Sequence, residues 1–207
     1  MTIVIVDYGI GNIMSIQNAF SRLGLSSPEL SRRPEVLRSA SGLILPGVGA
    51  FSACMNNLIK YELVNLLNEL VFEQRKPILG ICVGMQLMAN FSTEGGKHKG
   101  LGWIPAEVIR IKHNIEFQVP HVGWNDVNII QNNVLFENIT DKSHFYFDHS
   151  YHFVCDKFYV TATVDYGLLL NVAVQNGNIF GVQFHPEKSA NSGLRLFRSF
   201  TKYVQKC

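Results

Sequence analysis

We take a cysteine within an apolar run as the candidate nucleophile of this sequence. Residues Pro77 to Gln86 read Pro-Ile-Leu-Gly-Ile-Cys-Val-Gly-Met-Gln, so that Cys82 lies between two nearby glycines. One interpretation is that a cysteine between isoleucine and valine is simply a small buried hydrophobic residue without a chemical role. The flanking glycines indicate a different role, because Gly80 and Gly84 allow a sharp, strained turn that presents a nucleophile.

The elements expected around Cys82 would activate its thiol. Ile78 to Ile81 shows no polar alternation and predicts a buried parallel strand, while Met85 to Ala89 predicts the first turns of a helix. The sulfur would then project from the carboxyl edge of a sheet and face a helix N-terminus. The free N–H groups and positive dipole end of a helix lower the pKa of a nearby thiol and can hold an oxyanion.

A candidate base lies far along the chain, as expected for partners that the fold brings together. Gly181 to Lys188 reads Gly-Val-Gln-Phe-His-Pro-Glu-Lys, which we interpret as an apolar strand ending in His-x-Glu. Residues two apart on a strand share a face, so Glu187 would orient one imidazole nitrogen of His185 while the other faces Cys82. This is the arrangement of nucleophile, base and orienting acid found in catalytic triads.

A glycine-rich loop follows another predicted strand. Gly42 to Leu45 is apolar and is closed by Pro46-Gly47-Val48-Gly49. Such a loop can turn a backbone N–H toward a developing negative charge. A plain turn is the alternative, and closeness to Cys82 would favour the catalytic interpretation.

Neither a cofactor nor a metal ion is expected. The fragment Gly9-Ile10-Gly11 lacks the third glycine of a dinucleotide-binding fingerprint, because position 14 is Met14. Several metal-binding residue types occur between positions 149 and 156. His149 and His152 would point to opposite faces of a strand, so they could not share an ion without a bulge.

Composition favours a globular protein with a permanent partner. The 207 residues suit one α/β domain spanning 1–207, and the hydrophobic fraction of 47% excludes disorder. The net charge of +2, from 18 basic and 16 acidic residues, gives no reason to expect nucleic acid or an anionic membrane. Charged residues make up only 16%, below the usual quarter or so, which favours a surface covered by a partner.

The sequence also predicts a cytosolic location. No basic leader precedes the first strand, and no apolar run approaches the roughly 18 residues of a membrane helix. The four cysteines form no CxxC pair and no metal spacing, so they are expected to be reduced thiols.

The succession of elements predicts a mostly parallel central sheet flanked by helices. Strands and helices alternate through Ile81, whereas the part after Gly95-Gly96 is rich in aromatic and β-branched residues and predicts added, largely antiparallel strands. Asn176-Gly177 between two apolar runs predicts a tight hairpin. Expected strands are Ile3–Val6, Glu29–Ser31, Gly42–Leu45, Ile78–Ile81, Glu107–Ile111, Gln118–His121, His144–Phe153, Phe158–Val164, Val172–Val174 and Ile179–Gly181. Expected helices include Ile13–Leu23, Pro34–Ala40 and Ser192–Tyr203.

The motifs around Cys82, His185 and Glu187, together with Pro46-Gly47-Val48-Gly49, resemble the class I glutamine amidotransferases, and the resemblance covers nearly the whole chain. Within that class the sequence is similar to the glutaminase subunits of imidazole glycerol phosphate synthases. The similarity rests on three stretches: Asp7-Tyr8-Gly9-Ile10-Gly11-Asn12, Val119-Pro120-His121-Val122-Gly123-Trp124-Asn125 and Tyr146-Phe147-Asp148-His149-Ser150-Tyr151. It implies a flavodoxin-like α/β fold and L-glutamine as substrate.

The resemblance implies a role for each matching residue. Cys82 would attack the side-chain amide of glutamine to form a thioester, His185 would carry the proton to the leaving ammonia, and Glu187 would orient the imidazole. The N–H of Val83, where leucine is commoner, and one from Gly47, Val48 or Gly49 would form the oxyanion hole. Positions that hold glutamine match Gln86, Glu94, Ser150 and Tyr151, and positions near the face that meets the cyclase subunit match Asn12, Trp124, Tyr146 and Lys188.

A synthase partner is implied as well, because ammonia free in water would mostly be protonated and must reach its acceptor by a sequestered route. The expected assembly is a heterodimer with the cyclase subunit in histidine biosynthesis. Asp148 stands where an apolar residue is usual, and His-Ser-Tyr-His-Phe from His149 resembles a paralogous branch that supplies ammonia to surface-polysaccharide aminosugars. The alternatives from other functional classes are a silent scaffold subunit and another cysteine hydrolase, such as a peptidase or γ-glutamyl hydrolase.

Overall fold

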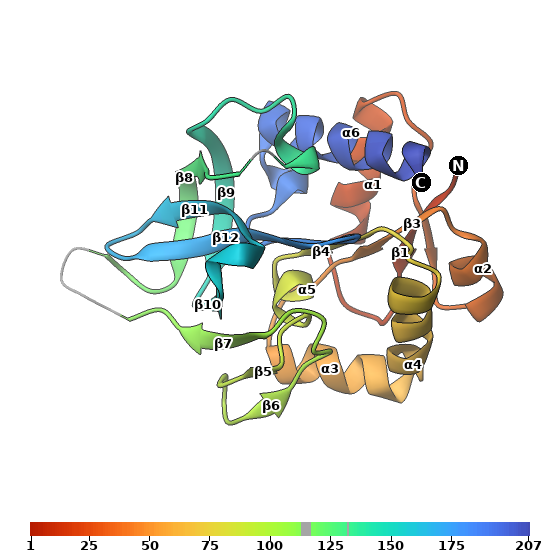
Figure 1. Ribbon diagram of the computed structural model, residues 1–207, viewed down its shortest axis with the longest axis horizontal. Helices are drawn as coiled ribbons and strands as arrows, with labels where there is room; N and C mark the ends of the chain where they lie inside the picture. Colours follow the sequence, from red (N-terminus) through yellow and green to blue (C-terminus); the bar gives the residue numbers. More distant parts are fainter. Residues whose placement is uncertain (113–116, 132) are drawn as a thin grey trace.

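The computed structural model describes residues 1–112, 117–131 and 133–207, and its centre is a parallel sheet (Figure 1). The strand order β2-β1-β3-β4-β13 has every neighbouring pair parallel. Every residue of β1, β3, β4 and β13 is buried, as the apolar runs in the sequence require. These strands are β1 (Ile3–Val6), β2 (Glu29–Ser31), β3 (Gly42–Leu45), β4 (Ile78–Ile81) and β13 (Ile179–Val182).

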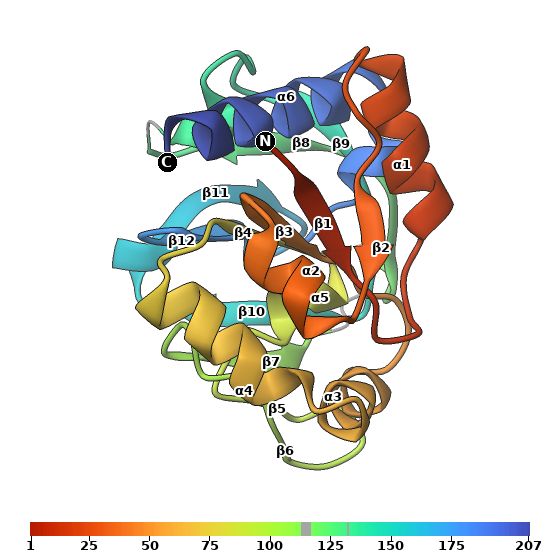
Figure 2. The ribbon, with the colours of Figure 1, turned by 90° about the vertical axis from the view of Figure 1, so that its right-hand side faces the viewer.

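Helices cover both faces of this sheet, as Figures 1 and 2 show from two sides. Helices α1 and α6 lie together on one face, and α3 and α4 lie on the other, with α4 extended by the π-helical turn η1. This layering removes both faces of the buried strands from water. The helices are α1 (Ile13–Arg22), α2 (Pro34–Ser39), α3 (Phe51–Lys60), α4 (Leu63–Asn68), η1 (Glu69–Glu73), α5 (Val83–Gln86) and α6 (Ala190–Lys206).

The second half of the chain extends the sheet with mostly antiparallel strands. Beyond β13 the order continues β12-β10-β7, and a further ribbon runs from β12 through β11 and β8 to β9. The predicted fold class is confirmed. The strands are β5 (Phe91–Ser92), β6 (His98–Lys99), β7 (Ala106–Arg110), β8 (His121–Ile129), β9 (Ser143–His149), β10 (Tyr151–Cys155), β11 (Val160–Asp165) and β12 (Leu169–Asn176), with 3-10 turns η2 (Val134–Phe136), η3 (Lys157–Tyr159) and η4 (Pro186–Lys188).

Several predicted elements are confirmed at nearly the predicted bounds. The first four strands of the parallel sheet and helices α1 and α2 lie where the apolar patterns placed them. The Asn176-Gly177 hairpin joins β12 to β13, and Gly177 has φ +58°, the left-handed conformation that such a turn needs. The last helix begins before Ser192 and continues to Lys206, and its Phe197 and Phe200 are buried as predicted.

Other predictions were wrong in their bounds. The short strand expected at Gln118–His121 is instead the long strand β8, which begins at His121 and runs to Ile129. The single strand expected from His144 to Phe153 is divided at Ser150 into β9 and β10. The strand expected from Phe158 starts at Val160, because η3 occupies the preceding residues.

The helix after Cys82 also differs from the prediction. It starts at Val83 rather than Met85 and ends at Gln86, so it contributes little more than one turn. Among the described residues, no helix combines the length and apolar character needed to cross a membrane.

The strands β1, β3, β4 and β13 are parallel, so their carboxyl ends share one edge of the sheet. The loops at that edge carry the candidate site.

Candidate active site

Cys82 sits on a strained turn between β4 and α5. Its φ of +54° and ψ of −112° are unusual for a residue with a side chain. A Cβ on Gly84 would lie 1.9 Å from the Leu45 carbonyl oxygen, and one on Gly80 would lie 2.7 Å from the Gly84 oxygen. The two glycines are therefore required by close backbone contact, and the predicted nucleophile turn is present.

His185 and Glu187 form a buried pair beside this turn. The distance from His185 Nδ1 to Glu187 Oε1 is 2.8 Å, and their side chains are 3% and 1% exposed. The interpretation of His-x-Glu as a strand end was wrong, because β13 ends at Val182 and Pro186–Lys188 form the 3-10 turn η4. The turn brings the two side chains together, and a hydrogen bond from His185 N to the Tyr146 oxygen, 2.9 Å long, fixes its position.

The environment of His185 keeps its imidazole protonated. Burial lowers the pKa, but hydrogen bonds and charge interactions with Cys82 and Glu187 outweigh burial and raise the pKa to about 10. Since Nδ1 is bonded to Glu187, Nε2 remains for Cys82.

Burial acts differently on Cys54 and Cys155, where it is the main cause that raises the thiol pKa to about 11 and about 12. Those two thiols stay protonated and unreactive at neutral pH.

Asn12 contributes to this pair although sequence reasoning placed it near the partner face. It occupies the N-cap position of α1, yet its side chain makes no capping hydrogen bond. Its Nδ2 lies instead 3.5 Å from Glu187 Oε1, a long contact with the same oxygen that His185 approaches. Asn12 therefore helps to orient the acid of the candidate triad.

The loop after β3 rests directly on the Cys82 turn. A Cβ on Gly47 would lie 2.4 Å from the Gly84 nitrogen, so no larger residue fits there. The Cys54 Sγ donates to the Val48 oxygen at 3.6 Å, while Gly49 has φ +85° and open space around its Cα. The loop is thus pressed against the turn at Gly47 and is less closely packed at Gly49.

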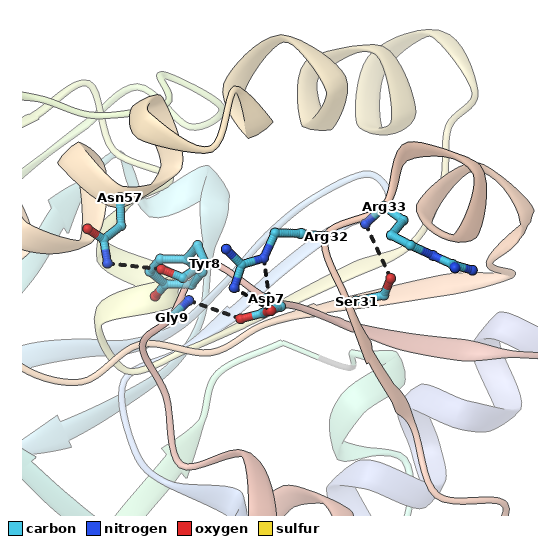
Figure 3. A network of polar contacts seen from close by, with 7 residues as sticks. All are labelled: Asp7, Tyr8, Gly9, Ser31, Arg32, Arg33 and Asn57. Atoms are coloured by element: carbon cyan, nitrogen blue, oxygen red, sulfur yellow. Dashed lines mark hydrogen bonds and ion pairs between the residues drawn. The ribbon is translucent and has the colours of Figure 1, made fainter.

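Arg32 and Asn57 hold the loop after β1 in place (Figure 3). Arg32 donates from Nη2 and Nε to Asp7 Oδ2 at 2.6 and 3.0 Å, and its guanidinium lies 4.0 Å from the centre of the Tyr61 ring. Asn57 of α3 donates to the Tyr8 carbonyl oxygen at 2.9 Å. With Tyr8 fixed in this way, its hydroxyl donates to the carbonyl oxygen of Pro46, at the start of the Gly47 loop.

A cavity of about 300 Å³ opens beside Cys82. Its size suits a small-molecule substrate. It brings together most of the residues predicted from sequence. The lining residues are Val48, Gly49, Cys82, Val83, Gln86, Glu94, Pro120, Asp148, His149, Ser150, Tyr151, His185 and Lys188.

Five predicted residues do not line the cavity. Gly47 supports the Cys82 turn from outside, and Glu187 and Asn12 lie behind His185. Trp124 and Tyr146 lie on β8 and β9, opposite each other in register, with ring centres 6.1 Å apart.

Two of the predicted substrate-binding side chains, those of Glu94 and Gln86, are held by hydrogen bonds. Glu94 Oε2 accepts a hydrogen bond from the Phe51 nitrogen at the start of α3, at 2.8 Å. Gln86 Nε2 donates to the Tyr151 oxygen at 3.0 Å and to Gln183 Oε1 at 2.9 Å. Side chains already fixed before a ligand arrives reduce the entropy cost of binding it.

Gln183 is a site residue that the sequence analysis missed. Its Nε2 lies 3.7 Å from Cys82 Sγ, and the residue is fully buried. Its amide therefore directs a hydrogen-bond donor at the sulfur. The available signal was a lone glutamine inside the apolar run Gly-Val-Gln-Phe.

Three of the four residues predicted to face a partner, Trp124, Tyr146 and Lys188, lie close together, and Lys188 also lines the cavity. Trp124 is 53% exposed, and the Lys188 Nζ lies 5.3 Å from the centre of the Tyr146 ring. Val122, two residues before Trp124 on the same strand, is also 53% exposed. We call Val122, Trp124, Tyr146 and Lys188 the aromatic rim.

Comparison with known proteins decides the family. The family model described as Glutamine amidotransferase class-I matches residues 4–202. The chain belongs to the class I glutamine amidotransferases. As a member it is an enzyme, and its predicted family is confirmed.

Relatives of this class I amidotransferase include subunits of one synthase. The Vibrio vulnificus protein named imidazole glycerol phosphate synthase subunit HisH 2 is 46% identical over 205 residues, covering 99% of this chain and 96% of the relative. The Moorella thermoacetica subunit HisH is 46% identical, covering 98% and 95%. The Campylobacter jejuni subunit HisH 1 (strain 81-176) is 40% identical, covering 97% and 99%.

Solved structures agree with the class I fold. A crystal structure of a glutamine amidotransferase superposes with a TM-score of 0.77 at 22% identity, covering 99% of this chain and all of the other. A structure from Thermoplasma acidophilum, described as a putative GMP synthase subunit, gives 0.76 at 19% identity, covering 100% and 94%. At these identities the likeness supports the fold alone.

Proposed function

We propose that this chain is the glutaminase subunit of an imidazole glycerol phosphate synthase. It hydrolyses L-glutamine to glutamate and ammonia and passes the ammonia to a cyclase subunit in histidine biosynthesis. The observation that carries the glutaminase chemistry is the buried His185–Glu187 pair against Cys82 on its strained turn. The relatives at 40 to 46% identity over nearly the whole chain support the synthase and its pathway.

The first half of the reaction forms a thioester. The Cys82 thiolate attacks the amide carbon of the glutamine side chain, and the carbonyl oxygen becomes an oxyanion. Backbone N–H groups of Val83 and of the Gly47–Gly49 loop stabilise that charge. The imidazolium of His185 donates its Nε2 proton to the amide nitrogen, the carbon–nitrogen bond breaks, and ammonia leaves.

The second half returns the enzyme to its starting state. A water molecule attacks the thioester carbon while His185 Nε2 accepts one of its protons. The tetrahedral intermediate expels the Cys82 thiolate and leaves glutamate. Glu187 stabilises the imidazolium at the start of each cycle and keeps its Nδ1–H directed away from the substrate, which is the reason for burying a carboxylate 2.8 Å from Nδ1.

The cavity also suits the charged end of glutamine. It is lined by the carboxylates of Glu94 and Asp148 and by the cation of Lys188. An amino acid carries both an ammonium and a carboxylate, so a cavity with both signs of charge can bind its two ends in one orientation. Gln86, Ser150 and Tyr151 complete the proposed substrate contacts.

The partner in this proposal docks on the aromatic rim. Exposed Trp124 and Val122 offer apolar area, and Lys188 offers a charge at the mouth of the cavity. Aromatic side chains of this kind are enriched where protein interfaces bury surface. A cyclase subunit seated there would cover the mouth and receive ammonia without releasing it to water.

We also propose the cytosol as the compartment, where a thiol nucleophile stays reduced.

A second candidate shares the chemistry and differs in the acceptor. Asp148 stands at a position where the histidine-pathway subunits are expected to have an apolar residue. Its side chain is exposed and lines the cavity. That position favours a paralogous role in which ammonia goes to an aminosugar synthase of surface polysaccharides.

The test is glutamate production from glutamine by the purified chain, alone and mixed with the cyclase and its nucleotide ligand. Strong stimulation by the liganded cyclase is the result that the histidine pathway predicts. Hydrolysis that depends on Cys82 but ignores the cyclase would transfer the proposal to the aminosugar branch. The variant Cys82→Ala must abolish hydrolysis in every mixture, and activity in that variant would refute the mechanism.

A further inference from the structure

Two buried histidines next to the cavity bond directly to each other. His121 opens β8 and His149 closes β9, and they are register partners in that ladder. The distance from His121 Nδ1 to His149 Nε2 is 2.9 Å, and the residues are 2% and 6% exposed. We call this pair the histidine bridge. The mechanism proposed above assigns it no role.

The position of each proton in the histidine bridge follows from its neighbours. His149 Nδ1 lies 2.9 Å from the Tyr151 carbonyl oxygen, which can only accept, so this nitrogen must carry hydrogen. In a neutral imidazole, His149 Nε2 is then an acceptor, and His121 Nδ1 must donate to it.

The outer end of the bridge agrees with this assignment. Asn125 Oδ1 accepts from the Asp126 nitrogen at 2.8 Å, which orients the amide so that Nδ2 carries the hydrogens. Asn125 Nδ2 lies 3.3 Å from His121 Nε2, which therefore accepts. Both imidazoles are neutral in this pattern. Burial, the main cause, lowers the pKa of His121 to about 4 and that of His149 to about 3.

Ring stacking holds the histidine bridge in place. The His121 ring lies between Phe147 and Tyr166, with ring centres 4.5 and 4.0 Å away and interplanar angles of 21° and 30°. The Tyr166 hydroxyl donates to the Gln118 oxygen at 2.8 Å, which fixes that ring in turn. His121 therefore has little freedom to break its bond to His149.

The inner end of the bridge leads to the nucleophile. The Tyr151 oxygen accepts from His149 and also from Gln86 Nε2 at 3.0 Å. Gln86 donates in addition to Gln183, and Gln183 Nε2 points to Cys82 Sγ at 3.7 Å. Hydrogen bonds thus connect Asn125 on β8 with the Cys82 sulfur, through side chains that are largely buried.

We propose that the histidine bridge is a positioning device for the glutaminase reaction, through which strand β8 of the aromatic rim holds the Tyr151 carbonyl, Gln86, Gln183 and Cys82 in register. This inference rests on the proposed function and adds to it a route by which a docked partner affects the site. Trp124 of the aromatic rim is the neighbour of Asn125. A displacement of β8 therefore reaches Tyr151 without any contact between partner and substrate.

The test uses the full chain with and without the liganded cyclase. His121→Leu removes the donor to His149 and leaves a buried acceptor unpaired, so kcat should fall by about tenfold or more, as expected when a site loses its fixed geometry. Stimulation by the cyclase ligand should fall as well. His121→Asn places an amide donor near the former Nδ1 position and should recover a large part of both.

His152→Leu is the matched control. His152 is 7% exposed on β10, next to Tyr151, and its Nδ1 has no hydrogen-bond partner among the described residues. This variant should keep the parent kcat and stimulation. Equal losses in His121→Leu and His152→Leu would mean that any buried histidine here matters only for packing, and would overturn the proposal. An unchanged His121→Leu variant would overturn it too.

A second measurement does not depend on activity. Nitrogen-15 NMR of the imidazoles distinguishes protonated from unprotonated ring nitrogens, and should show hydrogen on Nδ1 and none on Nε2 in both histidines at neutral pH. Hydrogen on His149 Nε2 would refute the bridge even if no variant folded. A parent chain without Cys82-dependent hydrolysis would refute the proposed function and the positioning role together, whereas an active parent with an insensitive bridge refutes the bridge alone.

Discussion

Replacing Gly84 by alanine tests whether backbone contact at the Cys82 turn sets the catalytic geometry. The new Cβ would lie 1.9 Å from the Leu45 oxygen, and an ordinary contact needs at least about 3.0 Å, so the Leu45–Pro46 peptide or the turn must move by roughly 1 Å. Overpacking of this kind costs about 1–3 kcal/mol of stability. A displacement of about 1 Å between nucleophile and oxyanion loop lowers kcat/KM by about a hundredfold.

Gly42→Ala separates the two effects. Its Cβ would lie 2.7 Å from Val204 Cγ2, at the amino end of β3 and away from the cavity, so it should cost stability without moving the turn. Urea unfolding gives the stability of both variants, and glutamate production at saturating cyclase gives kcat/KM. If Gly84→Ala lost no more activity than Gly42→Ala at equal stability, the backbone contact would not control the geometry and the reasoning would be refuted.

Four further outcomes are expected. Glu187→Gln should lower kcat by about a hundredfold and move the alkaline limb of the pH–rate profile to lower pH, because the carboxylate helps to raise the pKa of His185; an unmoved limb would contradict this. Lys188→Ala should weaken assembly with the cyclase in a titration, and unaffected assembly and ammonia transfer would remove Lys188 from the interface. Gly49→Pro forbids φ +85° and should change the stimulation of hydrolysis by the cyclase ligand, so unchanged stimulation would count against a mobile oxyanion loop. His149 is neutral when buried and titrates near pH 6.5 when unfolded, so this group should contribute its full stability above pH 6.5 and about 2 kcal/mol less at pH 5. His185 has a raised pKa and contributes in the opposite direction, so urea unfolding of the parent is compared with that of His149→Phe at pH 8 and pH 5, and an equal pH dependence in both would disagree.

The sequence predicted those parts of the fold that one local pattern determines. The strands of the parallel sheet are uninterrupted apolar runs, and Asn176-Gly177 has the chemistry of a tight hairpin, so neighbours along the chain were sufficient. Strand β8 was missed beyond His121 because Asn125 and Asp126 are poor strand residues. Its pairing with β9 is decided by distant residues.

Among the candidate site residues, those with a local sequence signal were likewise predicted, and those that depend on distant partners were missed. Cys82 was found from its flanking glycines, which the structure explains by contacts of 1.9 and 2.7 Å. The pairing of His185 with Glu187 was predicted for the wrong reason, because a turn rather than a strand brings them together. Gln183 and the histidine bridge were missed, since a polar residue within an apolar run shows only that it needs a partner, and the identity of that partner depends on the fold.

The loop of the candidate oxyanion hole is restrained more strongly at Gly47 than at Gly49, and this difference bears on regulation by a partner. Gly47 is pressed against Gly84, and Tyr8 binds the carbonyl of Pro46, so the start of this loop is restrained. The next peptide, which carries the Val48 carbonyl and the Gly49 N–H, is bound only by the long 3.6 Å contact from Cys54 Sγ, and a Cβ at Gly49 would meet open space. Change in the hole should therefore be confined to the Gly49 N–H. A partner seated on the aromatic rim needs to bias only this peptide, while the histidine bridge keeps Cys82 in place.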